Sequence, residues 1–327
     1  MRSPYPDIEP YQVHLFDMRA NEGETVHQIY VEECGNPNGI PIVFLHGGPG
    51  SGCRPSHRCL FDPHSYRIIL FDQRGCGRSQ PYGCLENNRT EYLINDLEQI
   101  RETLAIRQWI VFGGSWGAAL ALTYAQQHSE RVTALVLRGV FLGRKSDVGW
   151  VYDHGGAAKI FPEAWQNLMS TLTPCERETP LRSFYTILLD SDTQRSGEVS
   201  EALNQWERHL VRLVSPAHIT LKDATSCRGG DAKDAAKIIQ LHYSLNEFFI
   251  SHRPILANMK TINAIPTFVI HGRYDMVCPL EQAWQLYQKN QNIELDVMPL
   301  SGHVAEEPEI LEAILNLTDR LARRFSG

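Results

Sequence analysis

One short stretch of the chain carries a serine in a spacing that is typical of a nucleophile. The segment "WIVFGGSWGAAL" (109–120) places Ser115 two residues after Gly113 and two residues before Gly117. A β-rich run precedes the serine and small helix-forming residues follow it, so the G-x-S-x-G pattern falls at a sharp turn between a strand and a helix. This context predicts that Ser115 is a nucleophile and that the glycines allow its tight turn. The alternative is a glycine turn that serves packing alone.

A serine hydroxyl becomes reactive when a histidine takes its proton and an acid orients that histidine. In architectures with this serine turn, the three residues follow the chain order serine, acid, histidine. Asp275 in "FVIHGRYDMVCP" and His303 in "MPLSGHVAEEP" each come just after an apolar, strand-like run. The sequence therefore predicts a catalytic triad of Ser115, Asp275 and His303, chosen by position from thirteen histidines.

Acyl transfer also needs two N–H donors that bind the oxyanion of a tetrahedral intermediate. One predicted donor is the backbone N–H of Trp116, the residue after the nucleophile. The other is expected in the loop "FLHGGPGSG" (44–52), whose glycines let the backbone approach a substrate closely. Within this loop Gly48 is the first candidate and Gly47 is the alternative.

The elements that position these residues alternate between strands and helices. Apolar runs at 41–47, 66–75, 109–112 and 132–142 are predicted to be buried strands, with helices predicted over 91–104 and 118–130. Strand signals return at 265–272 and 293–303, and an amphipathic helix is predicted over 308–325. Such alternation predicts an α/β fold with a mostly parallel central sheet flanked by helices.

The segment between the two groups of strands has a different character. Residues 144–258 are rich in helix formers and aromatic residues and contain few β-branched runs. We therefore expect residues 1–143 and 259–327 to form two parts of one catalytic core, and residues 144–258 to form a helical cap inserted between them.

Composition excludes several other classes of protein. The 31 basic and 38 acidic residues give a formal charge of −7, so nucleic acid is not an expected partner. No apolar run reaches the roughly 18 residues of a membrane helix, and the N-terminus does not resemble a signal peptide. Eight cysteines without a C-x-x-C pair are expected to be reduced thiols of a cytoplasmic protein.

No cofactor or metal is expected from the sequence. The segment "RGCGRS" (74–79) lacks the lysine that a phosphate-binding loop requires. His242, His252 and His271 and the scattered cysteines lack the spacing of zinc ligands, so packing or surface roles are expected for them.

Several motifs together give the chain a family resemblance. "HGGPG", "DQRGCGRS", "GGSWGAALAL", "HGRYDMVCP" and "SGH" occur in this order, and the similarity runs almost from end to end. The chain resembles the proline iminopeptidases, which are serine peptidases with the α/β-hydrolase fold. The resemblance implies removal of an N-terminal proline from small peptides that have a free N-terminus, without a cofactor.

The resemblance also implies residues of the cap that bind substrate. In the family, glutamates of the cap bind the free amine, and Glu207, which follows Trp206, matches one of them. Phe141 matches an aromatic residue of the substrate pocket, and Trp150 matches a cap tryptophan. At the place of the second glutamate this chain has Gln240, which brings no charge.

Other positions of the cap depart from the family pattern. Val151 and Ser244 stand where the family has aromatic residues. The loss of these rings is expected to weaken apolar contact with the pyrrolidine ring of a substrate proline. Glu247 or Asp234 could supply the missing carboxylate, since residues 227–235 look like an insertion close by. These departures leave open how strictly the site prefers proline.

Two further functions are consistent with the same residues. A carboxylesterase or another acyl hydrolase would use the same triad but would give Glu207 no role, because an ester needs no cation. A binding module on a hydrolase scaffold would not need an intact triad. Aspartate-nucleophile chemistry, as in dehalogenases and epoxide hydrolases, is excluded by Ser115. No feature of the sequence indicates an oligomeric state.

Overall fold

The computed structural model describes residues 2–19, 25–190, 193–212 and 234–325, and within them eight strands form one sheet. The strand order is β1-β2-β4-β3-β5-β6-β7-β8. The strands are β1 (Gln12–Met18), β2 (His27–Gly35), β3 (Ile40–Leu45), β4 (Tyr66–Phe71), β5 (Trp109–Ser115), β6 (Val132–Val140), β7 (Thr267–Gly272) and β8 (Glu294–Met298). From β4 to β8 every neighbouring pair is parallel, which confirms the predicted mostly parallel sheet.

Helices cover both faces of the sheet because the central strands are apolar on both sides. In β5, Val111 packs on the face covered by α1 (Thr90–Thr103), α2 (Trp116–Gln127) and α8 (Leu280–Lys289), whereas Phe112 packs on the opposite face. That second face is covered by α9 (Pro308–Phe325) and the short helix η1 (Pro55–Leu60). Successive residues of a strand point to opposite faces, so a continuous apolar run fills two cores.

The first two strands were not predicted from the sequence. β1 pairs antiparallel with β2, and β2 pairs antiparallel with β4. β1 forms one edge of the sheet, and its side chains alternate between exposed and partly buried. Its exposed face carries polar and apolar residues alike, so the strand gives no strong apolar signal in the sequence.

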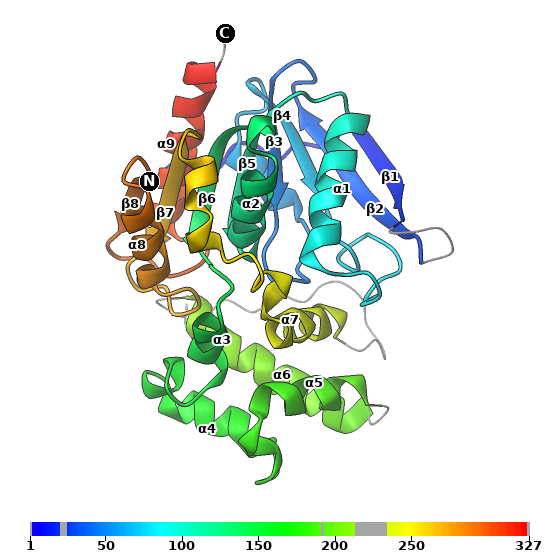
Figure 1. The fold of residues 1–327 in the computed structure, drawn as a ribbon, viewed down its shortest axis with the longest axis vertical. Helices are drawn as coiled ribbons and strands as arrows, with labels where there is room; N and C mark the ends of the chain where they lie inside the picture. Colours follow the sequence, from blue (N-terminus) through cyan, green and yellow to red (C-terminus); the bar gives the residue numbers. More distant parts are fainter. Residues whose placement is uncertain (1, 20–24, 191–192, 213–233, 326–327) are drawn as a thin grey trace.

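A group of helices lies beyond the carboxyl ends of the parallel strands. It contains α3 (Lys145–Tyr152), α4 (Pro162–Ser170), α5 (Pro180–Leu189), α6 (Thr193–Val211) and α7 (Ala235–Leu245). Figure 1 shows these helices below the sheet, apart from α1, α2, α8 and α9. Their side chains enclose a hydrophobic cluster around Trp165, Phe184 and Trp206 that is distinct from the two clusters of the sheet.

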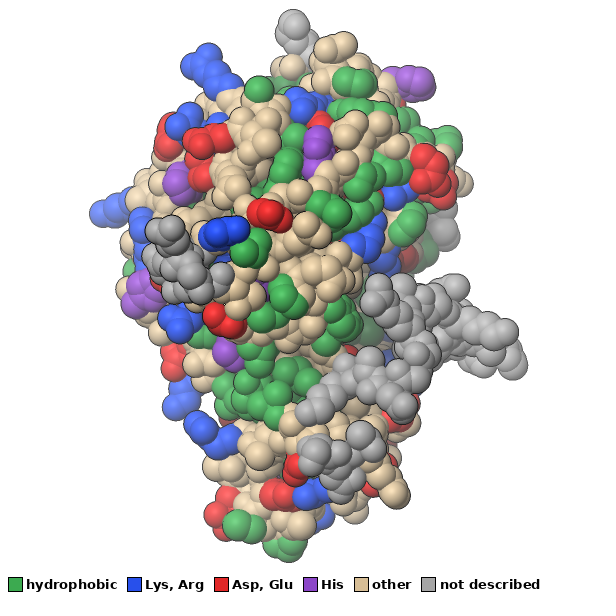
Figure 2. Space-filling model, turned by 90° about the vertical axis from the view of Figure 1, so that its right-hand side faces the viewer, with side chains coloured by type: hydrophobic (Ala, Val, Ile, Leu, Met, Phe, Trp, Pro, Cys, Tyr) green, Lys and Arg blue, Asp and Glu red, His purple; other side chains and the backbone are tan. Residues whose placement is uncertain are grey.

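The surface shows no large field of one charge on the side that carries β1. Figure 2 shows acidic and basic side chains interspersed over the described part of this face. None of the helices in the described ranges combines the length and the apolar character that a bilayer span needs.

Candidate active site

Ser115 stands at the corner between β5 and α2, where the chain reverses from a strand into a helix. Its backbone has φ 58° and ψ −124°, a conformation that L-residues adopt at a cost of about 1–3 kcal/mol. The flanking glycines make this corner possible: a Cβ at Gly113 would collide with the carbonyl oxygen of Gly117, and a Cβ at Gly117 with that of Leu45. The corner therefore holds the hydroxyl of Ser115 beyond the end of the sheet and at the N-terminus of a helix.

His303 and Asp275 form a buried acid–base pair next to this corner. Asp275 lies three residues after β7 and His303 five residues after β8, and His303 Nδ1 is 2.6 Å from Asp275 Oδ2. The other carboxylate oxygen, Oδ1, accepts hydrogen bonds from the backbone N–H groups of Val277 and Cys278, at 3.0 and 2.8 Å. These contacts fix the carboxylate so that it orients the imidazole.

The charge of the pair is set by its surroundings. Burial would raise the pKa of Asp275, but the positive charge of His303 and the hydrogen bond from its ring outweigh burial and lower that pKa below its ordinary value. The carboxylate is therefore ionised at neutral pH and faces the imidazole as an anion. A positive φ of 55° at Gly139 lets the backbone of β6 approach this pair closely, and a Cβ there would lie 3.1 Å from His303 and 3.3 Å from Asp275.

The backbone of His303 is also tied to the helical group. Its N–H donates to the carbonyl of Val211, the last residue of α6, at 3.2 Å. Its carbonyl accepts a hydrogen bond from the Arg138 guanidinium at 2.5 Å. The loop that carries His303 is therefore hydrogen-bonded both to Arg138 of the sheet and to Val211 of α6.

Cys278 lies beside the histidine and the aspartate. A thiol, a carboxylate and an imidazole atom of Cys278, Asp275 and His303 lie within 4.8 Å of one another, and Ser115, Cys278 and His303 line the same cavity. In the described ranges no hydrogen bond joins Ser115 to His303. The structure therefore gathers the three predicted residues of the triad at one place.

The loop after β3 packs directly against the serine. A Cβ at Gly47 would lie 3.2 Å from the Ser115 Cβ, and Gly48 adopts φ 109°, which suits glycine. The side chain of Gln73 links this loop to the residue after the nucleophile: Nε2 donates to the His46 carbonyl at 2.9 Å, and Oε1 accepts from the Trp116 indole at 2.9 Å. The two segments that carry the predicted oxyanion donors are thus joined by one buried amide.

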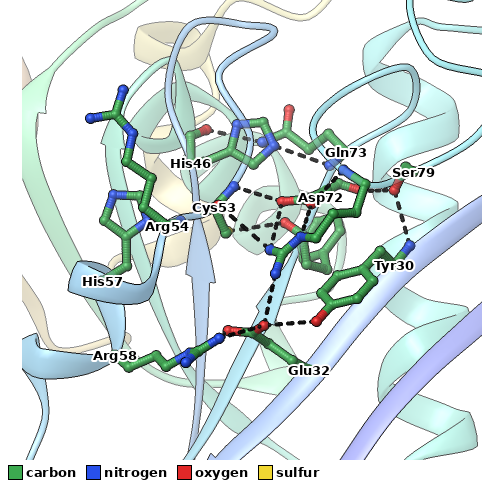
Figure 3. Close-up of polar contacts among 12 residues, drawn as sticks. Tyr30, Glu32, His46, Cys53, Arg54, His57, Arg58, Asp72, Gln73 and Ser79 are labelled. Atoms are coloured by element: carbon green, nitrogen blue, oxygen red, sulfur yellow. Dashed lines mark hydrogen bonds and ion pairs between the residues drawn. The ribbon is translucent and has the colours of Figure 1, made fainter. Parts of the chain in front are cut away.

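A buried ionic network supports the far end of the same loop (Figure 3). Asp72 accepts a hydrogen bond from the backbone N–H of Cys53 at 2.6 Å. It also forms an ion pair with Arg78 at 2.7 Å. Glu32 in β2 binds Arg78 at 3.0 Å and Arg58 at 2.7 Å. Because both carboxylates are fully buried and each is paired, the network anchors loop 46–53 to β2 and β4.

The serine, the histidine and the helical group share one cavity of about 490 Å³. Its lining comes from the sheet side and from the helices, and includes the predicted residues Gly47, Gly48, Ser115, Trp116, Phe141, Glu207, Gln240 and His303. Phe141 packs edge-on against Phe248, with ring centroids 4.7 Å apart. This volume lies within the range of about 300–1,000 Å³ that is usual for small-molecule sites.

Glu207 and Gln240 meet on one wall of this cavity. Gln240 Nε2 donates to Glu207 Oε1 at 2.7 Å, so the two positions that the family resemblance singles out are in contact. Sequence reasoning missed a third member: Lys237, one turn before Gln240, places Nζ 2.5 Å from Glu207 Oε2. The sequence carries no direct signal of this pair, because the two residues lie on different helices.

The structure does not bring Trp150 to the cavity. Its indole N–H donates to the Met276 carbonyl at 2.7 Å, which fastens α3 to the loop after β7. Among the described lining residues the neighbouring Val151 and Tyr152 appear in its place. The Tyr152 hydroxyl is buried and has no hydrogen-bond partner in the described part of the chain. Tyr152, two residues after Trp150, is a cavity residue that sequence reasoning missed, and its aromatic side chain was the available signal.

The two acids proposed as compensation do not face the cavity in the described structure. Asp234 caps the N-terminus of α7 by accepting from the Lys237 backbone N–H at 3.1 Å, and it also accepts from Ser200 at 2.8 Å. Glu247 is exposed. Of the suspected insertion at 227–235, residues 227–233 lie outside the described ranges.

The arrangement suits proton transfer better than metal binding. In the described ranges, Asp275, Cys278 and His303 are the single group of metal-ligand types that lie close together. The oxygens of Asp275 are already engaged by the imidazole and two backbone N–H groups. Burial raises the pKa of the Cys278 thiol well above its ordinary value, so the thiol stands neutral beside the pair.

Comparisons with known proteins place this geometry in a family context. Residues 40–307 match the family described as alpha/beta hydrolase fold. The chain is 41% identical over 329 residues to a probable proline iminopeptidase of Leptolyngbya boryana, covering 100% of this chain and 99% of that protein. It is 40% identical over 301 residues to the proline iminopeptidase of Neisseria gonorrhoeae, covering 92% of this chain and 94% of that protein.

Solved structures of lower identity share the same architecture. An esterase from Exiguobacterium antarcticum superposes with a TM-score of 0.55 at 20% identity, covering 92% of this chain and 97% of that chain. At this identity the likeness concerns the fold alone.

Proposed function

Because this chain belongs to the proline iminopeptidase family and has the α/β-hydrolase fold, we propose that it is a serine aminopeptidase that releases an N-terminal proline, or a similarly small residue, from small peptides. The observation that carries the proposal is the convergence of Ser115, at a strained strand-to-helix corner, with the buried His303–Asp275 pair on one cavity. The reaction needs no metal and no cofactor.

In the first step Ser115 attacks the carbonyl carbon of the N-terminal residue. The hydroxyl donates its proton to His303, whose free ring nitrogen takes it while Asp275 stabilises the charged ring. As the Oγ–C bond forms, the carbonyl oxygen becomes an oxyanion. The C–N bond then breaks, and His303 returns the proton to the leaving amine.

The oxyanion is bound by backbone N–H groups of two segments. Trp116 provides one, and Gly48, with Gly47 as the alternative, provides the other. Loss of one such donor typically costs about 3–4 kcal/mol of transition-state stabilisation. Water activated by His303 then attacks the acyl-enzyme, the ester bond breaks, and the free amino acid leaves.

The helical segment 144–258 acts as a cap that binds the N-terminal residue, and residues 1–143 and 259–327 form the catalytic core. Glu207 and Gln240 face the cavity from the cap and accept hydrogen bonds from the amine of the substrate. Phe141 contributes an apolar wall for the ring. Trp150 then acts by fastening α3 to the loop that carries Asp275, through its bond to Met276.

Kinetics on a panel of small substrates test the proposal. We expect kcat/KM for prolyl-2-naphthylamide to exceed that for the alanyl and leucyl compounds and for p-nitrophenyl acetate. Ser115→Ala should remove activity on all of them, by about 10⁴-fold or more, while the thermal unfolding midpoint stays close to that of the wild type. Turnover of the ester without turnover of any aminoacyl compound would contradict the proposal.

A carboxylesterase with the same triad is the second candidate, and one contact favours it. Glu207 is already paired with Lys237, so the protein itself supplies a cation for this carboxylate. An ester substrate would leave this pair undisturbed. Glu207→Gln separates the two functions, because it lowers kcat/KM for prolyl-2-naphthylamide in an aminopeptidase but leaves p-nitrophenyl ester hydrolysis unchanged in an esterase.

A further inference from the structure

Three side chains on α6 and α7 form a closed ring of polar contacts at the cavity wall. Lys237 Nζ lies 2.5 Å from Glu207 Oε2, and it also donates to Gln240 Oε1 at 3.1 Å. Gln240 Nε2 donates to Glu207 Oε1 at 2.7 Å. Each member of the ring therefore contacts both of the others.

The three members differ in how they face the cavity. Glu207 and Gln240 line it, and the Glu207 side chain is 25% exposed. Lys237 is not among the described lining residues, and its side chain is 5% exposed. The lysine thus stands behind the carboxylate, and a ligand in the cavity meets a carboxylate whose charge is already balanced from within the protein.

The charge balance of this wall decides how an incoming amine is bound. A hydrogen bond between two charged groups is about twice as strong as one between neutral groups. An ammonium that approaches Glu207 meets, besides the carboxylate, the like charge of Lys237 held 2.5 Å from the same carboxylate. A like charge paired with the same carboxylate disfavours the charged form of the ligand. Arg208, which lines the same cavity, is itself paired with Glu201 at 3.3 Å, so it does not alter the charge balance at Glu207.

We propose that Lys237 is a specificity-determining residue that makes the amine-binding subsite electrically neutral, so that the site accepts five-membered acyl groups with an uncharged ring as well as N-terminal proline. The inference rests on the proposed aminopeptidase function and defines its substrate class. Recognition then depends on ring shape and on neutral hydrogen bonds to Glu207 and Gln240, and the ammonium charge adds little to it.

A pair of matched substrates measures this effect directly. Prolyl-2-naphthylamide carries the amine, and cyclopentanecarbonyl-2-naphthylamide has the same ring size without any nitrogen in the ring. The measured quantity is the ratio of kcat/KM for the first to kcat/KM for the second. Lys237→Met keeps an unbranched side chain, one atom shorter, and removes its charge, so we expect the ratio to rise about tenfold, chiefly through a lower KM for the prolyl compound.

Two further variants serve as controls. Lys237→Arg retains the charge and should keep the wild-type ratio. Lys159→Met removes an exposed cation of the cap that forms no ion pair in the described ranges, and it should also leave the ratio unchanged. A merely structural role of Lys237 would change kcat/KM for both substrates alike and would not move their ratio.

The outcomes separate this inference from the proposed function. If Lys237→Met hydrolyses both compounds with the wild-type ratio, the inference is overturned and the aminopeptidase function stands. If the wild type hydrolyses p-nitrophenyl acetate but no prolyl compound, the proposed function itself fails. Should Lys237→Met not fold, Lys237→Gln removes the charge while keeping hydrogen-bonding groups for Glu207 and Gln240; a raised ratio supports the inference, and an unchanged ratio overturns it.

Discussion

Replacing Gln73 by methionine removes the amide that joins the two segments proposed to bind the oxyanion. In the wild type this side chain donates to the His46 carbonyl and accepts from the Trp116 indole, each at 2.9 Å, and it is 1% exposed. Methionine fills a similar volume but makes neither bond. The exchange therefore tests whether this amide positions the active site or only stabilises the fold.

The structure sets the size of the expected effect. A buried donor or acceptor left without a partner costs about 1–3 kcal/mol, and Gln73→Met leaves one of each. We expect the free energy of unfolding to fall by about 2–6 kcal/mol. A displacement of the reacting groups by about 1 Å can cost about 10²-fold in rate, so kcat should fall by about ten- to a hundredfold on both amide and ester substrates.

Gln126→Met is a matched control for this experiment. Gln126 is also a buried glutamine, but its amide bonds to the Ile255 carbonyl at 2.8 Å, outside the cavity, and its own carbonyl oxygen has no partner in the described ranges. We expect this variant to lose at most about 1–2 kcal/mol of stability with kcat unchanged.

The assay combines urea denaturation with steady-state kinetics at a temperature where both variants are folded. A Gln73→Met protein that is destabilised but keeps the wild-type kcat would refute the reasoning, since the amide would then have no part in placing the oxyanion donors. The same holds if Gln126→Met lowers kcat as much as Gln73→Met does.

Three further predictions concern the triad and the cavity. Gly139→Ala should lower kcat tenfold or more, because the new Cβ would lie 3.1 Å from His303 at a residue with φ 55°; unchanged kinetics would contradict this. Tyr152→Phe should raise the free energy of unfolding by up to about 1 kcal/mol, because it removes a buried hydroxyl without a partner among the described residues; a clear loss in urea denaturation would disprove it. Asp275 has a lowered pKa in the folded protein, so its contribution to stability is present above the unfolded pKa of about 4 and is lost as the pH falls through the lower folded value. Asp275→Asn should therefore flatten the fall of unfolding free energy below about pH 4 and lower kcat by about 10⁴-fold at neutral pH; an unchanged acid limb would rule out this account.

The parallel part of the sheet could be predicted from the sequence because its signal is local. The runs that became β3, β4 and β5 are apolar on both faces and end at turn residues, and no distant contact is needed to recognise them. β1 was missed because it lies at the edge and has a mixed outer face. β2 lies between β1 and β4 but carries Glu32 and Glu33 among its apolar residues, so pairing with the neighbouring strands is what identifies both.

The residues of the site also differ in whether a local sequence signal identifies them. Ser115, Asp275 and His303 could be selected from their places in the chain, since strand ends in a parallel sheet meet at one edge. Lys237 could not, because its partner Glu207 is 30 residues earlier on another helix and nothing local links them. The sequence does not reveal which side of α3 faces the cavity, so it singles out Trp150 although Val151 and Tyr152 are the lining residues of that helix.

The backbone bond from His303 to Val211 has a consequence for protein engineering. A chimera that exchanges residues 144–258 for the cap of another hydrolase would keep the whole triad but would remove the carbonyl that holds the histidine loop at 3.2 Å. A grafted segment must therefore supply an acceptor at the end of its corresponding helix, or the transplanted protein will combine its new specificity with a less firmly held His303. Residues 144–258 and the loop of His303 are joined by this hydrogen bond as well as by the chain, so any exchange of the proposed cap has to preserve it.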